Sequence, residues 1–324
     1  MTESDTNAEQ KAQCPEALQE VIDDIDRRQQ RPKHRVFEGI PEFHKDDHHY
    51  LRKFRELANG IPIHQLELDK VVSAMHLLQA QFPWFTPVID KIFKGLLFRV
   101  ANGHLEFKFD PILLVGPPGI GKTKFCRELG KSCHVHVQFQ SAAGSADNKL
   151  FQGTARGWGS TYPSLPLVIF QESMVANPIV IVDEIDKLGT NRHNGNLIDT
   201  LLQFTEPESS TRWYDECLLK TCDISKINWI FTANDASEIP EALRSRLKIV
   251  HVEGPSPEHF DVVLESVLGE FAHGLNIDPR FFHLDMEERA ILKKTFLTSS
   301  IRIFARLLES FLARKDDYLR QVAH

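Results

Sequence analysis

The sequence predicts an α/β fold, in which a parallel sheet is covered by helices on both faces and is followed by a small helical domain. Short apolar strands alternate with helical segments from residue 112 to residue 252. Because these strands are apolar on both faces, they are typical of a sheet that is buried between two helical layers. After Pro255 only helical patterns continue. The 324 residues are enough for one large domain with smaller attachments.

The region before the first strand carries the patterns of three helices. Residues 15–31 have helical spacing, and an irregular, exposed connection rich in proline and charge is expected over residues 31–49. Helical patterns return at residues 67–82 and 86–103, directly before the first strand. We therefore expect an N-terminal helical and irregular extension over residues 1–60. The apolar stripe of the first helix consists of Leu18, Val21, Ile22 and Ile25.

Five apolar runs are expected to form the strands of the sheet, inside a large α/β domain over residues 61–253. Residues 254–324 contain helical patterns only and are expected to form a small helical lid domain. The expected strands are residues 112–115, 134–140, 179–183, 228–233 and 249–252.

Composition and charge limit the classes of partner. With 42% hydrophobic and 26% charged residues, the chain has the balance of an ordinary globular protein. The sequence has neither an apolar run of bilayer length nor the basic and apolar start of a secretion signal, so we expect a cytoplasmic protein without membrane contact. A formal net charge of −7 disfavours broad attraction to nucleic acid. The five cysteines form no CxxC pair and are expected to be reduced thiols.

The stretch GPPGIGKT, between an apolar strand and a helical segment, is the clearest functional signal. It fits the pattern GxxxxGK[ST] in the required context. Glycines let backbone amides curl around phosphate oxygens, and the helix that follows adds its positive end. Lys122 would reach the outer phosphates of ATP, and the Thr123 hydroxyl would bind Mg²⁺. The expected phosphate-binding residues are Gly116, Pro117, Pro118, Gly119, Ile120, Gly121, Lys122 and Thr123.

Two further strand ends carry polar side chains suited to the same site. IVIVD places Asp183 at a strand end, where its carboxylate can hold Mg²⁺, and Glu184 is suited to polarise the water that attacks the terminal phosphate. NWIFTAND places Asn234 just past another strand, within reach of both the water and the phosphate. Each pattern alone is also ordinary turn chemistry, and the phosphate loop favours the catalytic interpretation.

Two arginines follow a short helical segment in IPEALRSRLKIV. Arg244 and Arg246 are two residues apart, so their side chains cannot both point the same way. An arginine delivered to a neighbouring copy of the chain can stabilise charge on a transferring phosphoryl group. The alternative is a salt bridge within the chain.

Together these residues resemble the AAA+ ATPases, and among them most closely the ATPase module of Lon proteases. The resemblance covers residues 85–312 and rests on FDPILLVGPPGIGKT, NPIVIVDEIDKLG, LLQFTEPESS and FTANDASEIPEALRSRLKIV, in Lon-like order and spacing. It implies a P-loop AAA+ fold with a three-layer arrangement and a helical lid. It also implies ATP hydrolysis in a homo-oligomeric ring, expected to be hexameric. In that register Asn234 is the first sensor, Arg246 rather than Arg244 is the arginine finger, and Arg302 is the second sensor.

A second loop, FQGTARGWGSTYP, is similar to the Lon loop that lines the central pore. Trp158 occupies the place of the aromatic side chain that grips polypeptide, and a flat ring can press against an extended chain of any sequence. Gly157 and Gly159 replace bulkier residues of the family, and burial of the ring in its own loop is the alternative. The resemblance does not extend to the Lon peptidase domain within the residues up to His324, so no proteolysis is expected.

The sequence therefore predicts a chaperone-like ATPase ring that remodels, unfolds or threads protein substrates, with no protease activity of its own. A nucleotide-dependent switch or loader acting on one protein partner is the first alternative, and it needs the ATP site but not Trp158. A loader acting on nucleic acid is the second alternative, which the acidic total and the Lon-like motifs disfavour.

Overall fold

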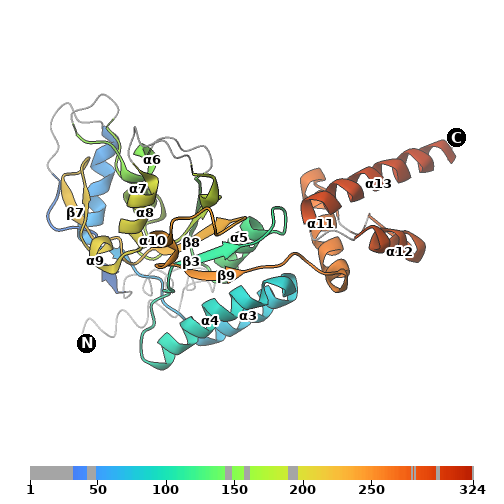
Figure 1. Ribbon diagram of the computed structural model, residues 1–324, viewed down its shortest axis with the longest axis horizontal. Helices are drawn as coiled ribbons and strands as arrows, with labels where there is room; N and C mark the ends of the chain where they lie inside the picture. Colours follow the sequence, from blue (N-terminus) through green and yellow to red (C-terminus); the bar gives the residue numbers. More distant parts are fainter. Residues whose placement is uncertain are drawn as a thin grey trace, which may run out of the picture.

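The computed structural model has a five-stranded parallel sheet at its centre, with the strand order β4-β5-β8-β3-β9 (Figure 1). The strands are β3 (Ile112–Val115), β4 (Val137–Ser141), β5 (Ile179–Asp183), β8 (Asn228–Ala233) and β9 (Lys248–His251). The residues that the structure describes are 32–41, 49–142, 148–156, 161–188, 196–278, 280, 282–296 and 300–322. The predicted α/β fold class is confirmed.

Helices cover both faces of the sheet. Because successive side chains of a strand point to opposite faces, Ile112 and Leu114 pack into one apolar layer, and Leu113 and Val115 pack into the other. One layer is covered by α3 (Leu68–Gln81), α4 (Thr86–Ala101) and α5 (Lys122–Ser132), and the other by α7 (Leu165–Ser173) and α8 (Leu197–Thr205). Figure 1 shows α3 and α4 side by side beneath the sheet.

The strand expected over residues 134–140 begins later, at Val137. The end of α5 explains the difference. His134 takes a left-handed backbone conformation with φ 54°, and the Val135 amide donates to the Gly130 carbonyl oxygen at 2.8 Å. This turn closes the helix and keeps both residues out of the sheet.

Part of the described chain before residue 60 is more buried than its charge and prolines predicted. β1 (Lys33–His34) pairs antiparallel with β2 (Ile61–Pro62), and η1 (His49–Asn59) follows. Val36 and Phe37 are buried in the layer of α7 and α8. Two adjacent apolar side chains are therefore enough to anchor part of the connection that was expected to be exposed.

Several short elements connect the main ones. The hairpin of β6 (Trp213–Asp215) and β7 (Lys220–Cys222) had no counterpart among the expected strands. Its strands are three residues long, which is too short for a periodic pattern to be visible. The remaining short helices are η2 (Pro83–Phe85), α6 (Lys149–Gln152), η3 (Ile185–Lys187), α9 (Pro207–Ser210), α10 (Glu241–Arg244) and η4 (Pro257–His259).

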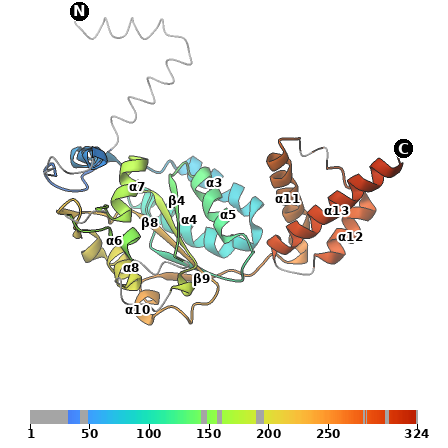
Figure 2. The same cartoon turned by 90° about the horizontal axis from the view of Figure 1, so that it is seen from above.

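Three helices after β9 lie to one side of the sheet, as both views show (Figures 1 and 2). They are α11 (Phe260–Leu275), α12 (Met286–Thr295) and α13 (Ile301–Val322). Phe260, Phe296 and Phe304 make mutual edge-to-face contacts in their centre, with ring centroids 5.0 to 5.9 Å apart. Among the described residues, no helix combines the length and the apolar character needed to span a bilayer.

Candidate functional site

The loop of residues 116–121 joins β3 to α5 at the carboxyl end of the sheet, and its glycines are needed for steric reasons. Gly119 and Gly121 have φ values of 82° and 96°, and residues with a side chain rarely adopt this backbone conformation. A Cβ atom on Gly116 would lie 2.3 Å from the Val252 carbonyl oxygen. Glycine at these positions therefore lets the loop pass close to the chain after β9 and make its tight turns before α5.

Lys122 lies at the centre of this loop. Its ammonium group donates to the carbonyl oxygens of Gly116 and Pro117, at 2.5 and 3.2 Å, and to Asn234 Oδ1 at 3.1 Å. Burial lowers the pKa of Lys122, and the charge of Asp183 opposes that effect. The cation thus connects the loop after β3 with the end of β8, two strands that are neighbours in the sheet.

Asp183 lies at the end of β5, with both carboxylate oxygens near hydroxyl groups. Thr123 Oγ1 lies 3.5 Å from Asp183 Oδ2, and the hydroxyl of the buried Thr232 donates to Asp183 Oδ1. Thr232 Oγ1 also accepts the Glu184 amide at 3.1 Å. A hydroxyl and a carboxylate are the oxygen ligands that suit Mg²⁺, so Thr123 and Asp183 fit the ion chemically.

Glu184 has a left-handed backbone conformation, with φ 58°. Its Oε1 accepts a hydrogen bond from Lys187 at 2.5 Å, and this contact raises the pKa of Lys187. The sequence predictions did not include Lys187, although the spacing of three residues in DEIDK is one at which acid and base pair on a helix. The carboxylate expected to activate water is therefore engaged by a neighbouring cation.

Asp186 holds the end of β8 in place. Its Oδ2 accepts the amides of Asn234 and Asp235, at 2.8 and 3.3 Å. The sequence predictions named Asn234 but not this partner. The sequence shows Asp186 only as the third acidic residue of DEIDK, and no spacing rule predicts its contact with a residue 48 positions away.

Arg246 is held within its own chain. Its Nε donates to Glu206 Oε2 at 2.6 Å, and its Nη1 donates to the Ala242 carbonyl oxygen at 2.7 Å. The side chain is about one third exposed, at 35%. The structure therefore contains the intrachain salt bridge that was the alternative to an arginine finger. None of these described contacts joins Arg246 to the phosphate loop of the same chain.

The start of α13 lies against the phosphate loop. The Ile301 amide donates to the Gly119 carbonyl oxygen at 2.8 Å, and a Cβ on Gly119 would lie 3.3 Å from the Arg302 Cβ. Arg302 is exposed beside the loop. Trp84, which the sequence predictions did not name, donates from Nε1 to the Ile120 carbonyl oxygen at 3.0 Å. The loop is thus contacted both by the start of α13 and by the segment between α3 and α4.

Trp158 lies outside the residues that the structure describes, but the chain on either side of it is well tied. The Thr154 amide donates to the Tyr162 carbonyl oxygen at 2.7 Å. Arg156 Nε donates to the Cys217 carbonyl oxygen at 3.0 Å, in the turn between β6 and β7. The buried Asp215 accepts the Ser164 amide at 2.8 Å.

The region that contains these residues is similar to known proteins. Residues 112–253 match the family model "ATPase family associated with various cellular activities (AAA)". The chain is 25% identical over 284 residues to the mitochondrial Lon protease homolog of Bos taurus, which covers 86% of this chain and 29% of that protein. It is 32% identical over 168 residues to the Lon protease of Chlamydia pneumoniae, covering 51% and 20%. The mitochondrial Lon protease homolog of Yarrowia lipolytica is 27% identical over 209 residues, covering 64% and 18%. The chain thus spans less than a third of the length of each of these relatives.

Proposed function

Because the chain is an AAA ATPase related to the ATPase module of Lon proteases, we propose that it works in a homo-oligomeric ring that uses ATP to remodel or thread protein. The observation that carries this proposal is the convergence of three strand ends on one cation: Lys122 contacts the loop after β3 and Asn234 after β8, beside Asp183 of β5. Parallel strands bring such groups together because their carboxyl ends share one edge of the sheet.

ATP would bind with its phosphates against the amides of residues 116–123 and the Lys122 ammonium. Thr123 and Asp183 would hold Mg²⁺, which neutralises charge on the phosphate oxygens. Glu184 would take the proton of the attacking water, and this requires its carboxylate to leave Lys187. Asn234, fixed by Asp186, would orient the water and the terminal phosphate.

The ring part of the proposal rests on Arg246 and Arg302. Arg246 is partly exposed and pairs with a surface carboxylate, Glu206. Because an exposed ion pair contributes little free energy, Arg246 could leave Glu206 for the more strongly charged phosphate at little cost in free energy. In a ring, expected to be hexameric, it would reach the terminal phosphate bound by the next copy. Arg302 lies beside Gly119, so a lid contact with the nucleotide would convert the state of the site into a movement of α13.

The protein-handling part of the proposal rests on the loop of Trp158. The hydrogen bond between Thr154 and Tyr162 joins its two flanks, and Arg156 anchors the first flank to the turn between β6 and β7. These anchors would let the loop transmit force from the domain to a bound polypeptide. The relatives are named as proteases, and for this chain we propose ATP-driven handling of protein without peptide-bond cleavage.

The test is ATP hydrolysis by the full chain at increasing protein concentration, with and without an unfolded protein such as carboxymethylated lactalbumin. The proposal expects turnover per chain to rise with concentration and to rise further with the unfolded protein. Trp158→Ala should remove the second increase and spare the first, and Trp158→Phe should keep both. An unchanged stimulation in Trp158→Ala would instead favour a nucleotide-dependent switch on one protein partner.

A further inference from the structure

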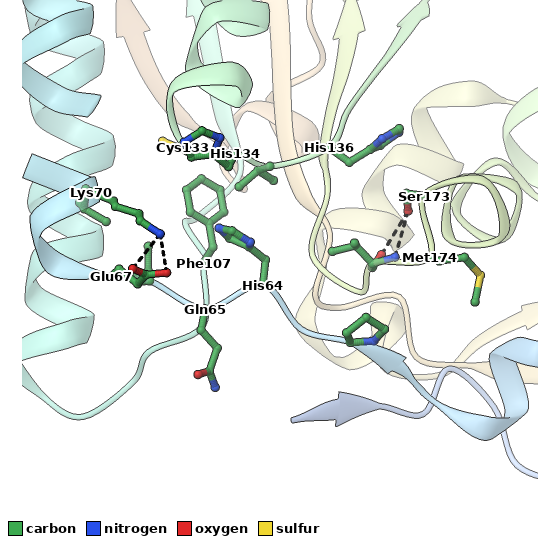
Figure 3. A pocket seen from close by; sticks show the side chains of 15 residues that line it. His64, Gln65, Glu67, Lys70, Phe107, Cys133, His134, His136, Ser173 and Met174 are labelled. Carbon is green, nitrogen blue, oxygen red and sulfur yellow. Dashed lines mark hydrogen bonds and ion pairs between the residues drawn. The ribbon is translucent and has the colours of Figure 1, made fainter. Parts of the chain in front are cut away.

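Two adjoining hollows lie at the amino end of the sheet, opposite to the phosphate loop. The first has a volume of about 670 Å³ and lies between α3, the end of α5 and the turn after α7 (Figure 3). The second, of about 630 Å³, lies between α5 and β4. They share His134, Val135 and His136, so together they form one groove, called here the edge groove. Its position follows from the fold, because β4 is the outer strand of the sheet and pairs only with β5 in the described part of the chain.

The edge groove is basic in an acidic protein. Three permanently charged basic side chains line it, Lys70, Arg127 and Lys131, against one lining carboxylate, Glu67. Lys70 pairs with Glu67 and Lys131 pairs with the adjacent Glu128, at 2.8 and 2.6 Å, so Arg127 carries the excess positive charge. Arg127 is exposed and lies over the ring of Phe139, with its guanidinium carbon 5.7 Å from the ring centroid. A guanidinium held in this way remains free to pair with a carboxylate.

Two further features of the lining favour an acidic and amphipathic occupant. α3 begins at the groove, where the side chain of its N-cap residue Glu67 accepts from the Lys70 ammonium at 2.8 Å and does not cap a backbone amide of the first turn. The amides of that turn, together with the helix dipole, favour a negative group. Apolar side chains also line the groove, among them Leu66, Val71, Phe107, Val135, Val137 and Phe139.

The sequence contains a matching segment, outside the described residues. Residues 1–26 hold eight acidic residues and one basic residue, a net charge of −7 that equals the charge of the whole chain. Residues 16–26 hold five of these acidic residues and lie in the segment of helical spacing, residues 15–31, which ends in Arg27, Arg28 and Arg31. The apolar stripe of that segment needs a surface to cover it. Charge and apolar pattern therefore both complement the edge groove.

The point where the described chain begins puts this segment within reach. The Pro32 carbonyl oxygen accepts the Ile63 amide at 2.9 Å, and Lys33 pairs with Pro62. Pro62 and His64 both line the edge groove. Asp26 precedes Pro32 by six residues, which span at most about 20 Å when extended. Attachment at the rim gives the segment a local concentration of about millimolar.

From the charge balance, the apolar match and this attachment, we propose that the edge groove is the docking site of the acidic segment of residues 16–26 of the same chain. Its carboxylates face Lys70, Arg127 and Lys131, and its apolar stripe covers Val137 and Phe139. The inference stands apart from the ATPase proposal, because the edge groove and the phosphate loop lie at opposite ends of the sheet.

The test uses the full chain and a carbodiimide, which joins a carboxylate directly to an amine in contact with it. Mass spectrometry of the peptides is expected to find Glu20, Asp23, Asp24 or Asp26 joined to Lys70 or Lys131 and not to Lys248, which lies on the opposite edge strand. In 1 M salt, where the screening length falls to about 3 Å, these products should decrease severalfold. Equal joining to Lys248 would overturn the proposal.

Two controls separate docking from chance contact and from exchange between copies. Arg127→Glu should reduce the Lys70 and Lys131 products about three- to tenfold at an unchanged melting temperature, and Arg212→Glu, another exposed arginine, should leave them unchanged. A mixture of ¹⁵N-labelled and unlabelled chains should give products of uniform label. Mixed-label products, or an unchanged yield in Arg127→Glu, would contradict docking within one chain.

Discussion

The two ends of the sheet differ in how their polar side chains are held. At the carboxyl end, Lys122, Asp183 and Asn234 each make a hydrogen bond to a group from another strand or loop, which restricts their orientation. At the amino end, the exposed Lys70 and Lys131 pair, within the described part of the chain, with carboxylates three residues before them, Glu67 and Glu128. Chemistry on a bound phosphate needs the first arrangement, because misplaced charges do not stabilise a transition state. The second arrangement suits a docking surface, because exposed side chains that are held only locally can adjust to a bound segment.

The largest expected effect comes from replacing, in separate variants, the lysines at the two ends of α5. Lys122→Ala should lower ATP hydrolysis at least about a hundredfold, because the cation that faces the phosphates is removed. Lys131→Ala, at the other end of α5, should change it less than about twofold. Steady-state hydrolysis at saturating ATP measures both. Equal losses in the two variants would erase the contrast between the ends.

Asp186→Ala should lower the turnover number about ten- to a hundredfold with little change in the KM for ATP. The change leaves the Asn234 amide without its acceptor and frees the side chain that would orient water. Asp186→Asn keeps one acceptor oxygen and should recover part of the loss. A rise in KM with unchanged turnover would show that Asp186 supports ATP binding instead of positioning Asn234.

Lys108, a buried cation at the amino end, allows a test of how burial of a charge affects the stability of the folded chain. Burial, with Arg99 and Lys226 nearby, lowers the pKa of Lys108 to about 8. The unfolded chain then binds more protons than the folded chain between pH 8 and 10.5, so the stability of the protein should rise with pH across that window. In Lys108→Met this rise should be smaller by about 2 kcal/mol, as measured by urea unfolding at pH 7.5 and pH 10. Parallel curves for the two proteins would contradict the lowered pKa.

The smallest effect is expected for Lys187→Met. Removing the hydrogen bond to Glu184 Oε1 frees the carboxylate, so basal ATP hydrolysis should rise about two- to fivefold. Lys94→Met breaks an exposed pair with Asp90 on α4 and provides the matched control, for which no change is expected. A fall in hydrolysis would mean that Lys187 contributes directly to the reaction.

The sequence predicted the sheet well because its strands carry their own signal. Each expected strand overlaps an observed one, since apolar runs between helical patterns depend only on local residues. β4 starts three residues late because the turn at His134 depends on a hydrogen bond to Gly130, which an apolar pattern does not encode. The β6–β7 hairpin was missed because its strands are short and its anchor, Asp215, acts through the distant Ser164 amide.

For the site, motifs indicated which residues gather but not what holds them. Lys122, Thr123, Asp183 and Asn234 lie together as the parallel topology requires. Thr232, Asp186 and Lys187 escaped notice because a threonine inside an apolar strand, or a further charge in an acidic run, has many ordinary uses. The edge groove escaped notice because its lining comes from four separate parts of the chain.

The central claim is that ATP is hydrolysed between two copies, with Arg246 of one completing the site of the next. It is tested most directly by mixing two variants, Glu184→Gln and Arg246→Ala, each expected to be nearly inactive alone. In a mixed ring, some sites combine Glu184 of an Arg246→Ala chain with Arg246 of a Glu184→Gln chain, so ATP hydrolysis should reappear on mixing. Activity that stays at the sum of the two separate variants would contradict the claim.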